Sequence, residues 1–282
     1  MARSIERIAG ASDPRVAAYR DVRDPELVRS RGLFVAEGRF VVRRAIEDRR
    51  CAIQSLLVND AALRDLGPLV DAIDPGAPVY VCDAHEFPGI AGFDVHRGCL
   101  ALVARPRALS IAEALAGVAT AIVLEGVTNP DNVGGVFRNA SAFGAGAVIL
   151  SPTCCDPLYR KAIRTSMGAA LRVPFARADE WPSAVAAIRE RGFTVAALTP
   201  REPSESIREW QVGRVGPVAE AGQARIALLV GTEGAGLTEE SEAAADVRIR
   251  IPISDAVDSL NLAVAVGIAL FALVTSDPTG DL

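Results

Sequence analysis

The sequence predicts an α/β protein with two domains, and three observations lead to this prediction. The chain has 282 residues, half of them apolar and 23% charged, which suits one large or two ordinary globular domains. Short apolar runs alternate with helical stretches along most of the chain. A basic segment with Pro106, residues 104–110, separates an irregular first region from a more regular second one.

The first region, residues 1–106, is predicted to be a small α/β domain. Its strand-like runs are short and rich in branched residues, and one helical stretch carries several arginines. Residues 107–117 are expected to link the domains, with Ser110 as a helix N-cap. The expected strands are Leu33 to Val35, Ser55 to Val58, Val79 to Cys82 and Cys99 to Val103, and the expected helix is Arg39 to Asp48.

The second region, residues 118–282, is predicted to be a parallel sheet covered by helices. Its strand-like runs are apolar on both faces, as buried parallel strands are. The polar stretch 200–224 is expected to be a surface excursion. The expected strands are Ala121–Leu124, Ala147–Leu150, Thr194–Leu198, Arg225–Val230 and Val247–Ile251; the expected helices are Gly135–Ala142, Pro157–Met167, Pro182–Glu190 and one from about Ser259.

The charge is spread unevenly. The net charge is −5, yet residues 1–50 contain 12 arginines against 8 acidic residues, whereas residues 176–282 contain 9 against 16. A basic end on an acidic body argues against a generic polyanion binder and suits local contact with phosphates, although a solvated charged face remains an alternative. The arginines of the first region cluster around one predicted helix, and we expect this cluster to contact RNA: Arg39, Arg43, Arg44, Arg49 and Arg50. The nearby Phe34 and Phe40 could stack on bases, but core packing is the expectation for both.

Cysteine, histidine and hydropathy patterns argue against a disulfide-bonded, a metal-binding and a membrane-anchored protein. The five cysteines form no C-x-x-C pair, which indicates reduced thiols and a cytoplasmic protein. Two histidines, far apart, give no metal site. The longest apolar run, residues 260–274, is shorter than the ~20 residues that span a bilayer, so we expect a buried helix and no membrane anchor.

Two glycine-rich loops do not fit nucleotide-phosphate loops. The first, TNPDNVGGVFRNASAFGA at residues 128–145, lacks the third glycine of a dinucleotide-binding loop. The second, GTEGAGLT at residues 231–238, has Leu237 where a P-loop needs lysine, and Glu233 brings negative charge. A dinucleotide-dependent enzyme is therefore disfavoured.

Three segments instead follow predicted strands: 129–139, 231–237 and 251–262. Ligands of open α/β sheets bind at the carboxyl edge of the strands, so the segments should form one site. Asn132, Arg138 and Asn139 lie six and seven residues apart and are expected to line one wall of it.

Taken together, these segments resemble the three motifs of the SpoU (TrmH) family of RNA 2′-O-ribose methyltransferases, in the SPOUT superfamily. They read NPDNVGGVFRNASAFGA, LLVGTEGAGL and IPISDAVDSLNLAVAVGIALF, in the family's order. The resemblance implies a deep trefoil knot, S-adenosylmethionine as cofactor and a homodimer formed through the catalytic domain. The first region, with LFVAEGRFVVRRAI at 33–46, is similar to the L30e-like substrate-binding domain of many family members.

The resemblance also implies residue roles. The residues that match active-site positions are Asn132, Arg138, Glu233, Ser259 and Asn261; those that match cofactor contacts are Gly231, Ile251, Leu260, Thr199 and Leu228; those of a further family segment near the site are Arg164 and Ser166, which we place with the RNA-binding residues. Ser259 alone could also be an ordinary helix N-cap.

The predicted function is S-adenosylmethionine-dependent methylation of a ribose 2′-hydroxyl in RNA. Ribosomal RNA of the 23S type is favoured because of the appended first domain; a tRNA 2′-O-methyltransferase and a non-catalytic RNA-binding protein on the same fold are the alternatives. A guanidinium stays protonated in proteins, so we expect Arg138 to grip a phosphate or polarise the ribose oxygen rather than act as a base.

Overall fold

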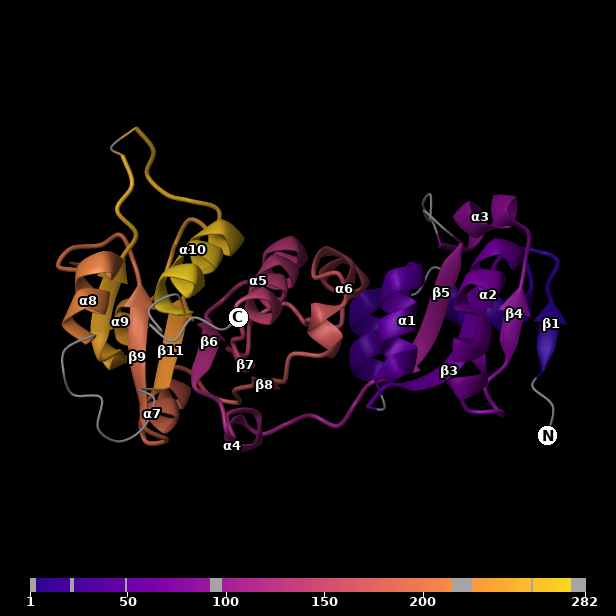
Figure 1. The fold of residues 1–282 in the computed structure, drawn as a ribbon, viewed down its shortest axis with the longest axis horizontal. Helices are drawn as coiled ribbons and strands as arrows, with labels where there is room; N and C mark the ends of the chain where they lie inside the picture. The colour runs from indigo at the N-terminus through magenta and orange to yellow at the C-terminus, as the bar shows by residue number, and fades with distance from the viewer. Residues whose placement is uncertain are drawn as a thin grey trace. The chain divides into compact units, whose positions relative to one another are not determined.

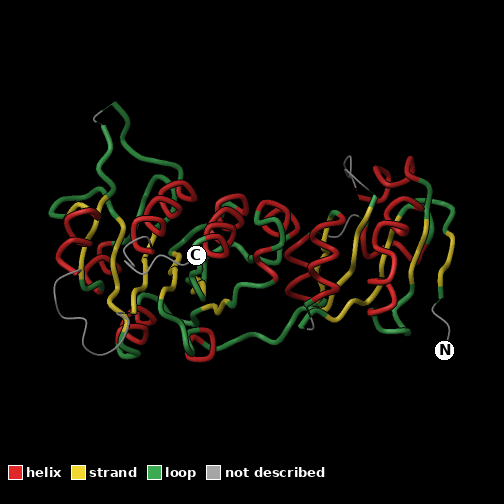
Figure 2. The backbone as a smooth tube through the Cα atoms, in the orientation of Figure 1, coloured by secondary structure: helices red, strands yellow, loops and turns green. Residues whose placement is uncertain are grey.

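The protein divides into two compact units, which we describe separately from a computed structural model (Figures 1 and 2). One unit is formed by residues 1–107 and 156–172, the other by residues 108–155 and 173–282. Arg49, residues 215–224 of the predicted excursion and the last residues of the predicted second domain lie outside the described part. The described residues are 4–20, 23–48, 50–91, 98–214, 225–254 and 256–274.

The first unit contains a five-stranded sheet in the order β1-β4-β3-β5-β2. β1, β4 and β3 run parallel, whereas β5 is antiparallel to both of its neighbours, β3 and β2. The strands are β1 (Ile5–Arg7), β2 (Leu33–Glu37), β3 (Ala52–Val58), β4 (Val79–Val81) and β5 (Cys99–Ala104), and the α-helices are α1 (Arg39–Glu47), α2 (Asp60–Leu66), α3 (Phe87–Ala91) and α6 (Arg160–Thr165).

A buried tyrosine organises the core of this unit. The Tyr19 hydroxyl is hydrogen-bonded to the Ser55 hydroxyl at 2.7 Å and accepts from the Leu102 amide at 3.3 Å. Buried polar atoms need such partners, and here they join strands β3 and β5. Tyr19 packs in an apolar cluster with Leu57 and Phe87, so this unit has its own core.

The second unit contains a seven-stranded, fully parallel sheet in the order β10-β12-β9-β11-β6-β7-β8. The strands are β6 (Thr120–Leu124), β7 (Ala147–Leu150), β8 (Phe175–Arg177), β9 (Phe193–Leu198), β10 (Glu205–Ser206), β11 (Arg225–Val230) and β12 (Val247–Arg250), and the helices are α4 (Ile111–Ala114), α5 (Pro130–Ala142), α7 (Ser183–Arg189), α8 (Ile207–Arg214), α9 (Glu239–Ala244) and α10 (Leu262–Val274).

Helices cover both faces of this sheet. Val123 and its neighbours on one face pack against α4 and α7. Ile122 points to the opposite face and is equally buried, as a doubly covered parallel sheet requires. Helices α5 and α10 pack on each other, close enough that the Asn139 side chain donates to the Ala263 carbonyl oxygen at 2.5 Å. The sheet therefore exposes its carboxyl edge between these layers.

Every strand expected from the sequence is present, with end shifts of up to three residues, and β1, β8 and β10 are additional. Helix α5 begins at Pro130, with the Asn129 side chain capping it, so it starts five residues earlier than predicted. Helix α10 begins at Leu262 rather than near Ser259. The predicted surface excursion contains β10, which pairs with β12, and helix α8.

The compact units differ from the predicted boundaries in two places. The expected linker 107–117 contains α4, whose Ala114 and the following Leu115 are buried in the core of the second unit. Residues 156–172, expected in the second domain, group with the first unit. There the Arg160 amide donates to the Asp24 carboxylate at 2.8 Å, a contact between segments distant in sequence.

Candidate active site at the carboxyl edge of the parallel sheet

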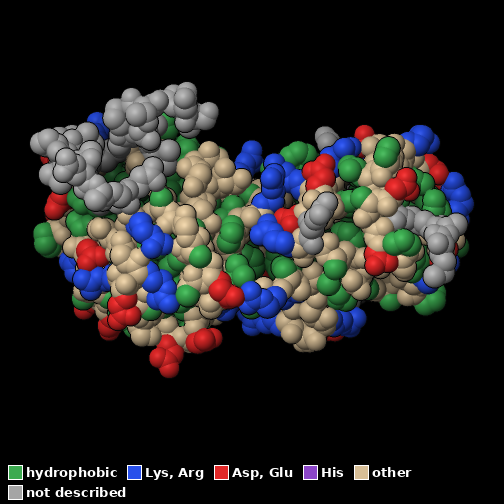
Figure 3. Space-filling model, turned by 60° about the horizontal axis from the view of Figure 1, so that its bottom comes forward, with side chains coloured by type: hydrophobic (Ala, Val, Ile, Leu, Met, Phe, Trp, Pro, Cys, Tyr) green, Lys and Arg blue, Asp and Glu red, His purple; other side chains and the backbone are tan. Residues whose placement is uncertain are grey.

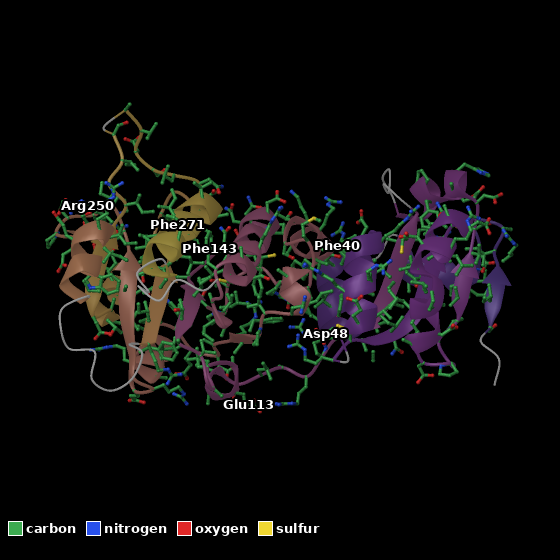
Figure 4. All side chains as sticks on the ribbon, in the orientation of Figure 1. Phe40, Asp48, Glu113, Phe143, Arg250 and Phe271 are labelled. Atoms are coloured by element: carbon green, nitrogen blue, oxygen red, sulfur yellow. The ribbon has the colours of Figure 1, made fainter. Side chains whose placement is uncertain are left out.

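A cavity of about 1000 Å³ lies at the carboxyl edge of the parallel sheet. Its walls come from the ends of β9, β11 and β12 and from the loop that leads into α10. Arg250, labelled in Figure 4, lines it at the end of β12. Two of the three predicted segments, 231–237 and 251–262, therefore share one cavity, as expected for this class of sheet.

The glycine loop after β11 is folded tightly on itself. The Gly236 amide donates to the Thr232 carbonyl oxygen at 3.0 Å. A Cβ on Gly231 would lie 2.1 Å from the Gly236 carbonyl carbon, so only glycine fits this backbone approach. The loop thus turns its backbone, rather than bulky side chains, toward the cavity.

Asn261 joins all three segments. Its amide nitrogen donates to Asn132 Oδ1 at 3.1 Å and to Glu233 Oε1 at 2.9 Å. Its Oδ1 accepts from the backbone amides of Ala263 and Val264 at 3.0 and 3.3 Å, and so caps helix α10. Three of the five predicted catalytic residues are therefore in direct contact, and the 4% exposure of Asn132 excludes water from one side of them.

Arg138 is placed differently from the prediction. Asn132 and Asn139 both face α10, as their seven-residue spacing requires, but Arg138 is rotated by about 120° on the helix and is exposed. Among the described residues the Arg138 side chain has no hydrogen bond or ion pair, and it does not line the cavity. The expectation that all three side chains form one wall is thus wrong for a single chain.

The remaining predicted residues divide into lining and buried positions. Gly231, Thr199, Ile251 and Leu260 line the cavity, and so does the predicted catalytic residue Ser259. Ser259 is exposed and is not the cap of α10, a role that Asn261 takes. Leu228 is fully buried within β11 and does not reach the cavity, because it lies two residues before the strand ends.

A buried carboxylate that the sequence analysis missed supports the glycine loop from one side. Glu125, directly after β6, accepts hydrogen bonds from Trp181 Nε1, Ser241 Oγ and the amide and hydroxyl of Thr238, at 2.8 to 3.1 Å. Thr238 follows the loop and caps α9. Glu125 therefore fixes the exit of the loop, and its place after an apolar strand in IVLEGV was the available signal.

An arginine clamp holds the same loop from the other side. The Arg201 guanidinium donates to the carbonyl oxygens of Ala235 and Leu237 at 2.9 and 3.0 Å. It also pairs with the buried Glu242 carboxylate at 3.3 Å. Glu242 in turn accepts from the Thr199 hydroxyl at 2.9 Å, which fixes a cavity-lining side chain. No local sequence pattern indicates this clamp, since its members come from three separate segments.

The predicted RNA-binding residues all lie in the first unit. Arg39, Arg43 and Arg44 are on α1, and Arg164 lies 3.6 Å from the Glu37 carboxylate. Burial raises the pKa of Glu37, an effect that the nearby arginines only partly offset.

The predicted Ser166 is buried at the end of α6. Its hydroxyl donates to the Ile163 carbonyl oxygen at 2.9 Å, so its visible role is to close that helix.

The cysteines, the possible metal ligands and the helix lengths bear on the other expectations from the sequence. The five cysteines are free thiols, four of them buried, and burial raises the pKa of Cys51 to about 11. Within the described ranges, no group of three or more His, Cys, Asp or Glu side chains is placed to hold a metal ion. No described helix combines the length and the hydropathy needed to cross a bilayer.

Comparison with known proteins places these features in context. The model of the SpoU rRNA methylase family matches residues 119–271. An uncharacterised tRNA/rRNA methyltransferase of Mycobacterium tuberculosis is 39% identical over 95% of this chain and 91% of its own length. A 23S rRNA (guanosine-2′-O-)-methyltransferase of Ralstonia nicotianae is 31% identical over 71% of this chain and 77% of its own.

Solved structures match almost the whole chain. Two rRNA methyltransferase structures from Sinorhizobium meliloti, the second of them AdoMet bound, are 25% and 24% identical, with TM-scores of 0.78 and 0.76. Each covers 95% of this chain and 97% of its own.

Proposed function

Because the chain belongs to the SpoU rRNA methylase family, we propose that it transfers a methyl group from S-adenosylmethionine to a ribose 2′-hydroxyl of RNA. The observation that carries the proposal is the contact of Asn261 with Asn132 and Glu233 beside the glycine-loop cavity. A non-catalytic RNA-binding protein would have no use for this arrangement. Ribosomal RNA is favoured over tRNA because the Ralstonia relative acts, by its name, on 23S rRNA.

The cavity fits the proposed cofactor. Its volume suits a nucleoside with a short tail, and its walls combine apolar Ile251 and Leu260 with the backbone of the Gly231 loop and the Thr199 hydroxyl. S-adenosylmethionine supplies an electrophilic methyl group that needs little further activation. Gly231, Thr199, Ile251 and Leu260 would bind the cofactor, whereas Leu228 is buried in the strand behind them.

The chain's own residues must then position and polarise the ribose. We propose that Asn132, Glu233 and Asn261 orient the reacting groups, with Ser259 at the cavity rim. Because a guanidinium is a cation and a hydrogen-bond donor, Arg138 serves as a phosphate clamp or stabilises negative charge on the ribose oxygen. Its exposure leaves the guanidinium accessible to a polyanion.

The assembly follows from the same proposal. Val264, Ile268 and Phe271 are exposed at i, i+4 and i+7 on α10, an apolar stripe that supports a homodimer through the catalytic unit. We further propose the trefoil knot and the L30e-like character of the first unit, which binds RNA through Arg39, Arg43, Arg44 and Arg164. An RNA substrate and free thiols support a cytoplasmic location.

Methyl transfer from labelled S-adenosylmethionine to unmodified total RNA tests the function. We expect label in one RNA size class, at the length of a large ribosomal RNA, and its loss with Arg138→Ala. Label in tRNA would select the tRNA alternative. Cofactor binding without label in free RNA would point to an assembled ribosomal particle, and absence of cofactor binding would contradict the proposal.

The rate of Arg138→Lys across pH tests the role of the guanidinium. A planar fork can hold two oxygens at once, whereas an ammonium is a point charge. We expect Arg138→Lys to lose at least about tenfold in rate. A rate near that of the wild type would exclude a bidentate role.

A further inference from the structure

Two large apolar side chains of the first unit are exposed next to one arginine. Phe40, in the first turn of α1, is 43% exposed, and Met167, after α6, is 42% exposed (Figure 4 labels Phe40). The Arg44 guanidinium carbon lies 4.3 Å from the centre of the Phe40 ring, and its Nη1 donates to the Met167 carbonyl oxygen at 2.8 Å. Phe40, Arg44 and Met167 thus form one surface from distant parts of the chain, which we call the stacking surface.

The backbone at Met167 is unusual. Met167 has φ of 53°, and among the described residues it is the one non-glycine residue in the left-handed region. It ends α6 at a position where glycine is common, with the Gly168 amide donating to the Ile163 carbonyl oxygen at 2.9 Å. Glycine would make this turn without steric cost, so the turn does not explain a methionine whose side chain is exposed.

The surroundings of the stacking surface are basic. Lys and Arg side chains gather over α1 and α6 in Figure 3. Helix α1 carries Arg39, Arg43 and Arg44, helix α6 carries Arg160, Lys161 and Arg164, and Arg172 follows α6 in the chain. Of the nearby acidic groups, Glu37 is buried, Asp48 is paired with Arg50 at 2.7 Å, Asp65 is paired with Arg39 at 3.9 Å, and Glu47 is exposed.

We propose that the stacking surface binds an unpaired base of an RNA, while the neighbouring basic side chains contact the flanking phosphates. Aromatic rings and arginine planes stack on bases whose faces are free, which requires a single strand, bulge or loop rather than a duplex. Apolar exposure alone would suit a protein partner, but the arginine stacked on the ring and the basic rim match a polyanion. The proposal rests on the proposed RNA methylation and adds that the first unit selects unpaired RNA.

Binding of three probes to the full chain tests the proposal without methyl transfer. The probes are oligouridylate, an abasic RNA backbone of the same length, and the oligouridylate paired with oligoadenylate. We expect the wild type to bind oligouridylate more tightly than the other two. Phe40→Leu should weaken only the binding of oligouridylate, by roughly tenfold, whereas Phe40→Tyr should retain it. The matched control is Ile5→Ala, which truncates another exposed apolar side chain of the same unit.

Met167→Gly separates binding from folding. Glycine relieves the left-handed backbone, so this variant should unfold at a higher temperature and still bind oligouridylate more weakly. A purely structural methionine would give the first effect without the second. Equal binding of all three probes by the wild type would overturn the proposal. So would an effect of Phe40→Leu on oligouridylate binding that is no larger than that of Ile5→Ala. A Phe40→Leu variant that changes the oligomeric state and keeps its RNA affinity would overturn it as well.

Methyl-transfer kinetics then connect the surface to the reaction. Phe40→Leu should raise the KM for RNA and leave kcat and cofactor affinity unchanged. Absence of cofactor binding by the wild type would contradict the proposed function, whereas equal binding of the three probes would contradict the stacking surface, so the two failures are distinguishable.

Discussion

At the scale of single residues, Asn261 combines a helix cap with contacts to two other residues of the candidate site. One end of its side chain caps α10, and the other donates to Asn132 and Glu233. Because both ends are used, the start of the helix and the Glu233 carboxylate are held in a fixed relation. Ser259 and Asn261, the two polar residues of the third motif, therefore differ in their contacts, since Ser259 only lines the cavity.

Asn261→Asp separates these two roles. Aspartate is an equally good N-cap, but it cannot donate to Asn132, and it places a second carboxylate against Glu233. We expect methyl transfer to fall at least about tenfold, since a hydrogen bond to a charged group is worth about 1.5–3 kcal/mol, while the helix cap is retained. Activity assays and thermal unfolding measure both effects. Full activity would contradict the role of the donor.

The sequence predicted some of these residues for sound reasons and misplaced others. Asn132 and Asn139, seven apart, share a helix face, which periodicity captures. Arg138 does not share this face, because a spacing of six residues from Asn132 turns its side chain by about 120° around the helix. Leu228 does not reach the cavity, because it lies within β11 and the glycine loop begins only after this strand.

At the scale of elements, two groups hold the glycine loop between β11 and α9 in its C-terminal half. Glu125 fixes Thr238, and Arg201 fixes the carbonyl groups of Ala235 and Leu237. Such contacts stiffen a loop that has little side-chain packing of its own. These contacts join residues that are far apart in the sequence, so a sequence pattern could not predict them.

Arg201→Ala should loosen this loop. We expect affinity for S-adenosylmethionine to fall roughly tenfold, from the loss of charged hydrogen bonds, with kcat at saturating cofactor less affected. The control is Arg189→Ala, because both arginines have side chains 47% exposed and pair with one carboxylate. Calorimetric titration compares them. Equal affinity in both variants would exclude the clamp.

Gly135→Ala tests the packing of α5 on α10. Helix propensity alone would stabilise this change by roughly 0.5–1 kcal/mol. The new Cβ, however, would lie 2.6 Å from Ala263 Cβ, so we expect the free energy of unfolding to fall by about 1–3 kcal/mol. In an Ala263→Gly background the same change should be neutral or stabilising. Stabilisation in the wild-type background would show that the helices can move apart.

In the second unit, the sequence predicts the presence of most strands and helices more accurately than the residues at which they begin and end. Buried parallel strands are continuous apolar runs, so β6, β7, β9, β11 and β12 were predictable. β8 is three residues long and lacks such a run. The sequence prediction places the start of α5 too late, although a capping asparagine before proline is a typical helix start.

At the scale of the whole molecule, the division into units was only partly predictable. The basic segment around Pro106 marked the change between units, and the structure divides next to it, after Arg107. Residues 156–172 join the first unit through long-range contacts, such as that of Arg160 with Asp24. These contacts leave no periodic signal. The outcome places Arg164 in the same unit as the arginines of α1.

The apolar stripe on α10 makes a prediction about assembly. Phe271 packs edge-on against Phe143, with ring centres 6.2 Å apart, yet remains exposed on its outer side (Figure 4). We expect the wild type to sediment as a dimer and Ile268→Glu to sediment as a monomer, because a buried charge opposes association. Ile5→Glu, on the other unit, should remain dimeric. A monomeric wild type would contradict the proposed dimer.

The most direct measurement of the central claim is the alkali resistance of the methylated product. A methyl group on the ribose oxygen removes the 2′-hydroxyl that alkali uses to cleave the adjacent phosphodiester bond. RNA labelled by the enzyme from S-adenosylmethionine is hydrolysed with alkali and its products are separated by charge. The account predicts that the label remains in dinucleotides. Label in mononucleotides would show methylation of a base and contradict the account.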